Sequence, residues 1–353
     1  MKLNIVLPVL GLVALAYSSI SQTYLVQVKP AGSKTWGYAN EKGEIVIPAT
    51  FEKCYEFSEE GYAPIYEPSE KAHHFIDVKG KRLATQITDF KLREGFLFGF
   101  GLRGFTEGMT AIMQNKKFGY MNTEGKVVVQ PKFNDATEFD GGYAVANSEA
   151  KRIIIDKKGN ETPVEIPGLL DVNKFSEGFA PYRAADKQWG FVNTSGKIVI
   201  QAKFLSVGYF SNGLAWAKTS DNKIGYIDTD GNWVIKPGFD VAKEFDKSTG
   251  LARVKTGEKW AYTNKAGEIS TMSDSEVISD FSDGLAEGKK NGKIGFYNAK
   301  CVWEIEPQFD GVRDFKNGFA AAKKGEKWGM INKQGDWVIQ PIYDGIHDMA
   351  LVK

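Results

Sequence analysis

Histidine is scarce in this sequence, with three residues among 353. Most acid–base and nucleophilic enzymes, and most zinc sites, depend on histidine at defined spacings. His73 and His74 are adjacent, so on a strand they would point to opposite faces and would not share a metal ion. No Ser–His–Asp or Cys–His set and no phosphate-binding glycine loop is apparent. We therefore expect no enzymatic activity, no catalytic residues, no cofactor and no bound metal.

Cysteine is equally rare, since Cys54 and Cys301 are the two in the chain. They lie in distant parts of the sequence, and a disulfide requires Cα atoms within about 7 Å. We expect two separate, buried or half-buried thiols. A ring-shaped fold would bring the ends closer and weaken that expectation.

An excess of positive charge is also missing. The 45 Lys and Arg residues nearly balance the 44 Asp and Glu residues, for a formal net charge of +1. Binding to phosphate backbones needs a basic surplus, so nucleic acid is not an expected partner. Beyond the N-terminus, no apolar run is long enough to cross a membrane.

The N-terminus resembles a signal peptide. Lys2 provides the positive start, an apolar stretch runs from Leu3 to Tyr17, and Ser19 and Ser21 are small residues at the positions that a signal peptidase reads. We predict a signal peptide over 1–21, cleavage before Gln22, and a periplasmic, cell-surface or secreted protein without a transmembrane span. The alternative is an uncleaved membrane anchor.

The rest of the chain, residues 22–353, is repetitive. About nine units of roughly 35 residues follow one another, most of them marked by an aromatic–Gly–aromatic pattern. Three degenerate units begin near His73, Arg152 and Trp260. The residues that we interpret as structural anchors of the repeat are Trp36, Gly37, Phe118, Gly119, Trp189, Gly190, Gly225, Trp233, Trp260, Gly295, Trp303, Trp328, Gly329 and Trp337.

Each unit contains signals for three short strands. The first ends in Asn or Asp, two polar residues and Gly, which is typical of a hairpin turn. The return strand ends at Pro, and a Phe–turn–Gly segment then leads to a strand with Ala. In Trp303–Glu304–Ile305 the charged residue should face water, so its two neighbours should face inward. Asp228 begins a segment similar to a calcium loop, but the final Glu is missing and sister repeats use the same slot as a turn.

The combined motif, complete between Lys223 and Ala252, resembles that of the WG-repeat family. The resemblance covers essentially all of the mature chain. It implies β-structured interaction units and offers no catalytic residues to transfer.

Two all-β architectures fit tandem antiparallel hairpin repeats. In an open superhelical array each unit covers its neighbour; in a propeller-like ring the ends meet. Propellers usually have four to eight blades. The segments 24–28 and 349–352 resemble the same strand of the unit, as caps on an open stack would. The sequence therefore favours the open array.

Two features depart from the repeat. Trp216 occupies an outward, variable strand position, where it could stack on a ligand or cover a neighbouring turn. An insertion in the second unit carries Phe96, Leu97, Phe98 and Phe100, which are candidates for partner contact or for an extra core strand. We expect an exported protein-binding or scaffolding module at the cell envelope, with a protein or envelope polymer as partner. The alternative is a carbohydrate- or cell-wall-binding protein that uses exposed aromatic residues.

Overall fold

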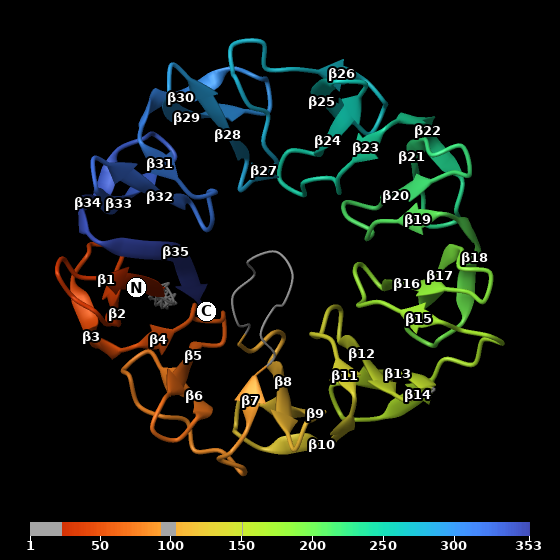
Figure 1. The fold of residues 1–353 in the computed structure, drawn as a ribbon, viewed down its shortest axis with the longest axis horizontal. Helices are drawn as coiled ribbons and strands as arrows, with labels where there is room; N and C mark the ends of the chain where they lie inside the picture. Colours follow the sequence, from red (N-terminus) through yellow and green to blue (C-terminus); the bar gives the residue numbers. More distant parts are fainter. Residues whose placement is uncertain (1–22, 93–103, 150) are drawn as a thin grey trace, which may run out of the picture.

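The computed structural model describes residues 23–92, 104–149 and 151–353. Within these ranges every regular element is a β-strand, and the strands form nine small antiparallel sheets. The sheets are blades that follow one another around a ring, with their innermost strands toward the ring centre (Figure 1). The all-β prediction is confirmed, and the fold is a nine-bladed β-propeller.

Blades 2 to 9 each use one continuous stretch of chain, and their strands run outward in sequence order. Blade 2 contains β4 (Lys53–Cys54), β5 (Tyr62–Glu67) and β6 (Ala72–Asp77), and blade 3 contains β7 (Lys91–Leu92), β8 (Met109–Gln114), β9 (Lys117–Asn122) and β10 (Val127–Phe133). Blade 4 contains β11 (Asp135–Ala136), β12 (Tyr143–Ser148), β13 (Lys151–Asp156) and β14 (Glu161–Pro163), and blade 5 contains β15 (Asp171–Val172), β16 (Phe179–Arg183), β17 (Trp189–Asn193) and β18 (Ile198–Phe204). Blade 6 contains β19 (Ser206–Val207), β20 (Ala215–Lys218), β21 (Ile224–Ile227) and β22 (Trp233–Phe239), and blade 7 contains β23 (Val241–Ala242), β24 (Leu251–Thr256), β25 (Lys259–Asn264) and β26 (Ile269–Ser270). Blade 8 contains β27 (Phe281–Ser282), β28 (Leu285–Lys290), β29 (Lys293–Asn298) and β30 (Trp303–Phe309), and blade 9 contains β31 (Gly311–Val312), β32 (Phe319–Lys324), β33 (Lys327–Asn332) and β34 (Trp337–Tyr343).

Blade 1 is built from both ends of the chain. Its innermost strand is the last one, β35 (Gly345–Val352), and its other strands are β1 (Thr23–Lys29), β2 (Trp36–Asn40) and β3 (Ile45–Phe51). Strands β1 and β35 pair antiparallel along almost their whole length, with Leu25 opposite Ala350. This pairing closes the ring (Figure 1).

The closure corrects the preference for an open array and confirms the ring alternative. The two ends carry complementary strands, not copies of one strand. Gly345 and Ile346 stand where other blades have their innermost strand, and the chain then continues along β1 where other blades turn back. Pairing the two termini also removes the exposed sheet faces that an open array would leave.

The glycine of the aromatic–Gly–aromatic pattern lies under the outermost strand. In six blades that strand has seven residues and shifts its pairing register directly above the glycine. A Cβ atom added to Gly190 would lie 2.3 Å from the carbonyl oxygen of Ile200, and 2.4 Å separates the same pair at Gly225 and Ile235. The glycine is required because main chain crosses it at contact distance.

The three degenerate units lack this crossing. Their third strands carry His74, Ile153 and Ala261 at the glycine position. The outer strand shrinks to Glu161–Pro163 in blade 4 and Ile269–Ser270 in blade 7, and blade 2 has three strands. Blades with a larger residue at the glycine position of the third strand therefore have a shorter outer strand or none.

Neighbouring blades are joined by paired aromatic rings. A third-strand aromatic packs on a Phe of the following blade, with ring centroids 4.8 Å apart for Tyr38 and Phe57 and 4.7 Å apart for Tyr226 and Phe245. The buried Tyr226 hydroxyl also donates a hydrogen bond of 2.7 Å to the carbonyl of Lys243 in that blade. Each ring pair buries apolar area and fixes the angle between two blades.

Hairpin turns between the third and outer strands follow the Asn/Asp-x-x-Gly rule. The Asn40 side chain accepts hydrogen bonds from the amides of Lys42 and Glu44, both at 3.0 Å, and Gly43 adopts φ = 81°. In blade 8 the glycine position holds Cys301, which adopts φ = 57°. Cys54 and Cys301 are both free thiols, the first buried and the second half-buried. Among the described residues, no helix has the length and apolarity to span a membrane.

Candidate functional site

The inner edge of the ring carries side chains that differ between blades. We define the inner-edge residues as those immediately before the Phe of the Phe–turn–Gly segment, or before Met349 in blade 1. They are Glu56, Gly104, Glu138, Lys174, Tyr209, Glu244, Asp280, Asp314 and Asp348. The side chains among them are all at least partly exposed to solvent. Carboxylates predominate, although the chain as a whole is nearly neutral.

A second varied position lies beside the inner edge, on the second strand. In blades 6 and 7 its side chain reaches the inner-edge residue of the next blade. Trp216 Nε1 donates to Glu244 Oε1 at 3.2 Å, and Arg253 Nε lies 2.8 Å from Asp280 Oδ1. In these two blades the two positions therefore form contacting pairs, and the two pairs differ in chemistry.

Trp216 was predicted to point outward, and the structure places its indole over Gly208 of its own blade. A Cβ atom at Gly208 would lie 2.1 Å from the indole nitrogen, so one face of the ring is covered by main chain. Trp216 remains half-buried beside the cluster that includes Phe245 and Val254. Trp216 therefore lies beside the inner edge, and the main chain at Gly208 covers one face of its indole ring.

Like charges face each other between blades 8 and 9. Desolvation by burial, followed by the nearby carboxylate of Asp314, raises the pKa of Glu287. The pKa of Asp314 is raised by desolvation and then by Asp348 and Asp280. This part of the inner edge holds negative charge that neighbouring cations do not fully balance.

The turns that follow the inner edge are linked from blade to blade. Glu177 accepts hydrogen bonds from the amides of Asn212 and Gly213, both at 2.9 Å, in the turn of the next blade. Burial would raise the pKa of Glu177, but these amides and Lys247 lower it overall. Glu107 makes the same contacts to Gly141 and Gly142, at 2.7 and 2.8 Å. These links hold the inner-edge side chains in fixed relative positions.

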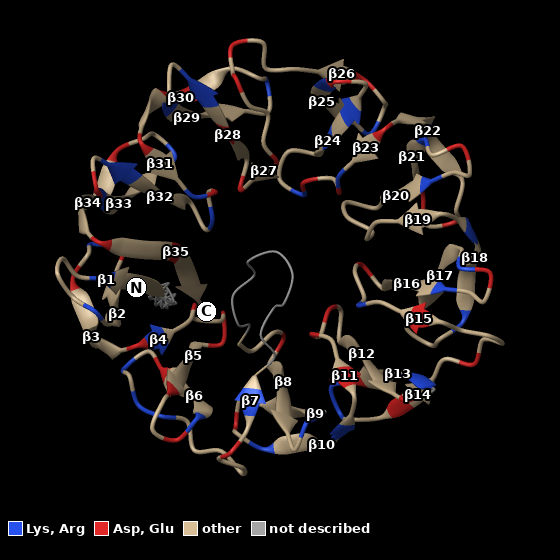
Figure 2. Cartoon of the chain, viewed as in Figure 1, with Lys and Arg blue, Asp and Glu red and all other residues tan. Residues whose placement is uncertain are grey.

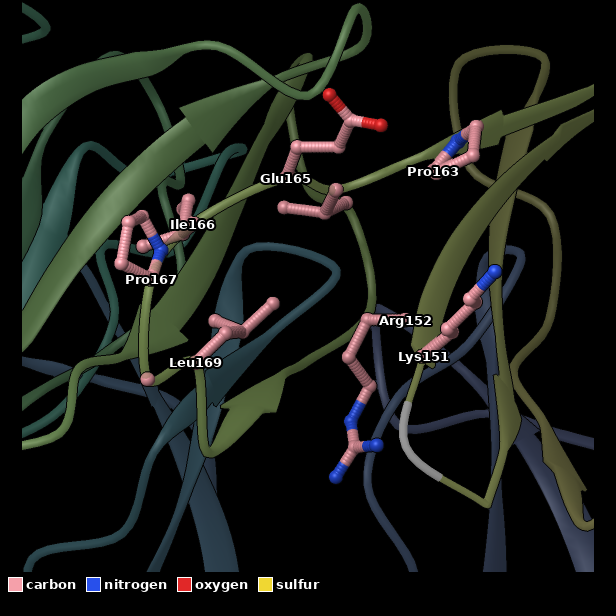
Figure 3. A pocket seen from close by; sticks show the side chains of 9 residues that line it. Lys151, Arg152, Pro163, Glu165, Ile166, Pro167 and Leu169 are labelled. Atoms are coloured by element: carbon pink, nitrogen blue, oxygen red, sulfur yellow. The ribbon is translucent and has the colours of Figure 1, made fainter.

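A cavity of about 570 Å³ is lined by residues of blade 4 and of the segment that follows it (Figure 3). Arg152 and Lys151 form one wall, and the segment from Pro163 to Leu169 forms the other. The Arg152 guanidinium is already bonded to the carbonyl of Leu170 at 2.7 Å and to Asp171 at 3.1 Å, and Glu165 points away from it. A catalytic site requires polar groups that converge on a common point, and the polar groups of this cavity do not.

The histidine and aspartate candidates from the sequence make contacts within the fold. His73 is buried, its Nδ1 accepts the amide of Leu92 at 3.2 Å, and its pKa falls to about 4 because of desolvation and nearby Lys91. His74 bonds to Glu70 at 2.7 Å. In the described ranges, no three His, Cys, Asp or Glu side chains are grouped to hold a metal ion. Asp228 caps its own turn, accepting amides of Asp230 and Asn232.

The predicted contact residues Phe96, Leu97, Phe98 and Phe100 lie outside the described residues. The predicted anchors occupy equivalent places in their blades. The glycines lie under the outer strand, and Trp233, Trp303 and Trp337 are half-buried at the start of that strand. The inner-edge carboxylates were not predicted from the sequence. Their signal was the acidic residue that precedes the turn Phe in most units.

A solved structure with a similar fold covers nearly the whole chain. A crystal structure of a eukaryotic initiation factor matches with a TM-score of 0.63 at 12% identity, covering 94% of this chain and 98% of that one. The computationally designed Ika8 protein matches with a TM-score of 0.40 at 11% identity, covering 80% of this chain and 93% of its own. At such identities the first likeness concerns the fold alone. No curated protein matches the sequence.

The family model for the WG containing repeat matches six times, over residues 36–67, 118–151, 189–223, 224–260, 294–328 and 328–350. Each match begins in the third strand of a blade that keeps the glycine and the seven-residue outer strand, and it continues into the next blade. Together the matches cover more than half of the chain. The chain therefore belongs to the WG-containing repeat family.

Proposed function

We propose that this protein is an exported, non-enzymatic module that binds a partner protein at the cell envelope through the inner edge of its ring. The observation that carries the proposal is a contrast between two sets of positions. The glycines, aromatic rings and turn residues that build the blades recur around the ring. The inner-edge residues range from Glu138 through Lys174 to Tyr209.

This contrast supports binding because a rigid frame with varied side chains can present one specific pattern to a partner. Charged residues of both signs are distributed around the ring (Figure 2). The turn-to-turn bonds of Glu107 and Glu177 reduce the conformational entropy that binding would cost. Non-enzymatic action is supported by the described cavity beside Arg152, whose polar groups do not converge.

Photo-crosslinking tests the proposal. A photoreactive amino acid is placed, one site at a time, at Lys174, Tyr209 or Asp314 in the producing cells. Matched control sites are Val199 and Val234, which are exposed on outer strands away from the inner edge. We expect one discrete protein adduct at inner-edge sites and none at the outer sites. Absence of adducts at every site, or equal labelling at the outer sites, would refute the proposal.

Export is tested separately by cell fractionation and by intact mass. Signal cleavage before Gln22 predicts a mature protein that begins at that residue and is recovered outside the cytoplasm. A chain that retains Met1 and stays in the cytoplasm contradicts export and leaves the binding proposal standing. A glycan array tests the carbohydrate alternative, which requires binding that Trp216→Ala abolishes.

A further inference from the structure

In the part of the chain that the structure describes, the ring lacks the regular turn at blade 1, and we call this junction the seam. In blades 2 to 9 the innermost segment ends in a Phe–turn–Gly that leads to the second strand. Blade 1 has no such turn, because its innermost strand β35 and its second strand β1 come from opposite ends of the described chain. The turn of blade 9 therefore meets the turn of blade 2 across blade 1, and Lys316 forms an ion pair with Glu56 there.

A cavity of about 1220 Å³ lies at the seam. Its wall includes Trp36 and His347 of blade 1, residues 52–60 of blade 2 and Arg313 of blade 9. Pockets for small molecules usually measure about 300–1,000 Å³. The seam cavity exceeds that range, and among the described residues blade 1 is the blade that lacks the turn.

One wall of the seam cavity is aromatic. The rings of Trp36 and His347 lie 4.8 Å apart at 54°, and Trp36 also covers Gly345. Desolvation and the neighbouring Arg313 lower the pKa of His347, so its imidazole is neutral near pH 7. An uncharged pair of aromatic rings at a partly exposed site offers a surface on which a cationic side chain can stack.

The remaining lining is rich in carboxylates. Six lining residues are acidic and three are Lys or Arg. Asp348 reaches Arg313 only at 4.0 Å, the limit of an ion pair. Desolvation by burial raises the pKa of Glu56 in spite of the opposing effect of Lys316. The cavity is therefore negative in a chain of nearly zero net charge.

A buried hydroxyl in the same cavity has no partner. Ser58 Oγ is buried and makes no hydrogen bond within the described chain, and Ser58 lines the cavity. Serines at the same turn position in other blades are bonded. Ser176, Ser211 and Ser282 donate to the carbonyl of the Phe in the next turn at 2.8, 2.7 and 2.8 Å. Leaving such a group unpaired costs free energy, which a ligand with a matching polar group would recover.

We propose that the seam cavity docks a basic peptide segment of the partner protein, with a Lys or Arg side chain held between the Trp36–His347 pair and the carboxylates of Glu56 and Asp348. The inference rests on the proposed protein-binding function and specifies where and what it binds. The cavity volume favours a peptide over a small molecule, the charge selects a cation, and Ser58 supplies a further hydrogen-bonding group. One seam per ring requires one peptide per protein.

The test uses the purified protein and a fluorescent hexa-arginine peptide, with hexaglutamate as the charge control. Anisotropy gives the Kd and calorimetry gives the stoichiometry. We expect one hexa-arginine per chain, no binding of hexaglutamate, and weaker binding as NaCl increases. In Glu56→Gln/Asp348→Asn we expect the Kd to increase about tenfold, since two charge-assisted contacts are lost.

The matched control is Glu124→Gln/Asp230→Asn. It removes two charges at exposed hairpin turns that lie outside the cavity and do not belong to the inner edge. We expect less than about a twofold change in Kd for this control. His347→Ala keeps the charge at neutral pH and should weaken binding through loss of ring contact. Thermal melting of each variant verifies that the ring is folded.

An equal loss in both double variants, several peptides per ring, or no binding would overturn the inference. Photo-crosslinking separates this failure from that of the proposed function. If adducts still form at Lys174, Tyr209 or Asp314 while hexa-arginine does not bind to the seam cavity, the protein binds its partner at the inner edge outside that cavity. If neither signal is found, both proposals are wrong.

Discussion

At the scale of single residues, the identity of one third-strand residue, Gly190 in blade 5 and Ala261 in blade 7, correlates with the length of the outer strand. Where it is glycine, the outer strand crosses it with seven residues, as β18 does over Gly190. Where it is Ala261, the outer strand ends after two residues and pairs with Tyr262 and Thr263 instead. The methyl group and the crossing main chain compete for the same space.

Gly190→Ala should therefore destabilise the protein by about 1–3 kcal/mol, because the added Cβ meets the Ile200 carbonyl oxygen. Urea denaturation followed by tryptophan fluorescence measures the change. Ala261→Gly is the matched control, and we expect it to cost no more than about 1 kcal/mol through backbone flexibility. Equal costs for the two variants would show that the crossing is not the reason for the glycine.

Cys301 gives a second prediction at this scale. It adopts φ = 57° at a turn position where sister units have glycine, and a side chain in that region is strained. Cys301→Gly should raise the free energy of unfolding by about 1 kcal/mol. The reciprocal variant Gly267→Ala, at φ = 82° in blade 7, should lower it. A loss of stability in Cys301→Gly would mean that packing of the thiol outweighs the turn strain.

At the scale of elements, β35 is the strand that closes the ring. It pairs with β1, and Lys353 beyond it contacts Glu59 in the turn of blade 2. Without β35, the backbone groups of β1 that it satisfies would become an exposed sheet edge.

Removal of residues 345–353 should open the ring, lower the melting temperature and promote association through β1. Small-angle scattering and thermal unfolding measure these effects. The control lacks only Lys353, whose exposed ion pair with Glu59 should contribute about 1 kcal/mol or less. An unchanged scattering profile in the longer deletion would contradict the role assigned to the closure.

Much of each blade could be predicted from the sequence because its signals are local. Asn40 and Gly43 define a hairpin within four residues, and alternation along Trp303–Ile305 indicates the buried face. Ring closure was not predictable in this way. The apolar segment 349–352 resembles the second strand of a unit, and its partner β1 lies at the opposite end of the described chain. The direction of Trp216 likewise depends on Glu244 in another blade.

At the scale of the whole molecule, the inner edge concentrates carboxylates that the fold brings together from separate repeats. Glu287 faces Asp314, and Asp314 is near Asp280 and Asp348. Such grouping lowers stability when the groups are charged, and it fits a surface kept for binding better than one selected for stability alone.

Glu287→Gln should consequently stabilise the protein at pH 7. The folded-state pKa of Glu287 lies above its ordinary value of 4.5, so the folded state disfavours the charged form. Its ionisation therefore reduces stability as pH rises from 4.5 through the raised pKa. The advantage of the glutamine variant should disappear below pH 4.5, where both states hold the proton. Denaturation midpoints across this pH range test the sign, and a larger advantage at low pH would refute it.

The pairing of β1 with β35 also limits how this gene can change length. A linear solenoid tolerates duplication or loss of one unit, because the remaining junctions keep their geometry. Here a tenth unit would separate the two termini unless every junction, including the one between Tyr226 and Phe245, relaxed its angle together. Degenerate units such as the one around Ala261 are therefore expected to be retained as spacers, since deleting them would leave the circle incomplete.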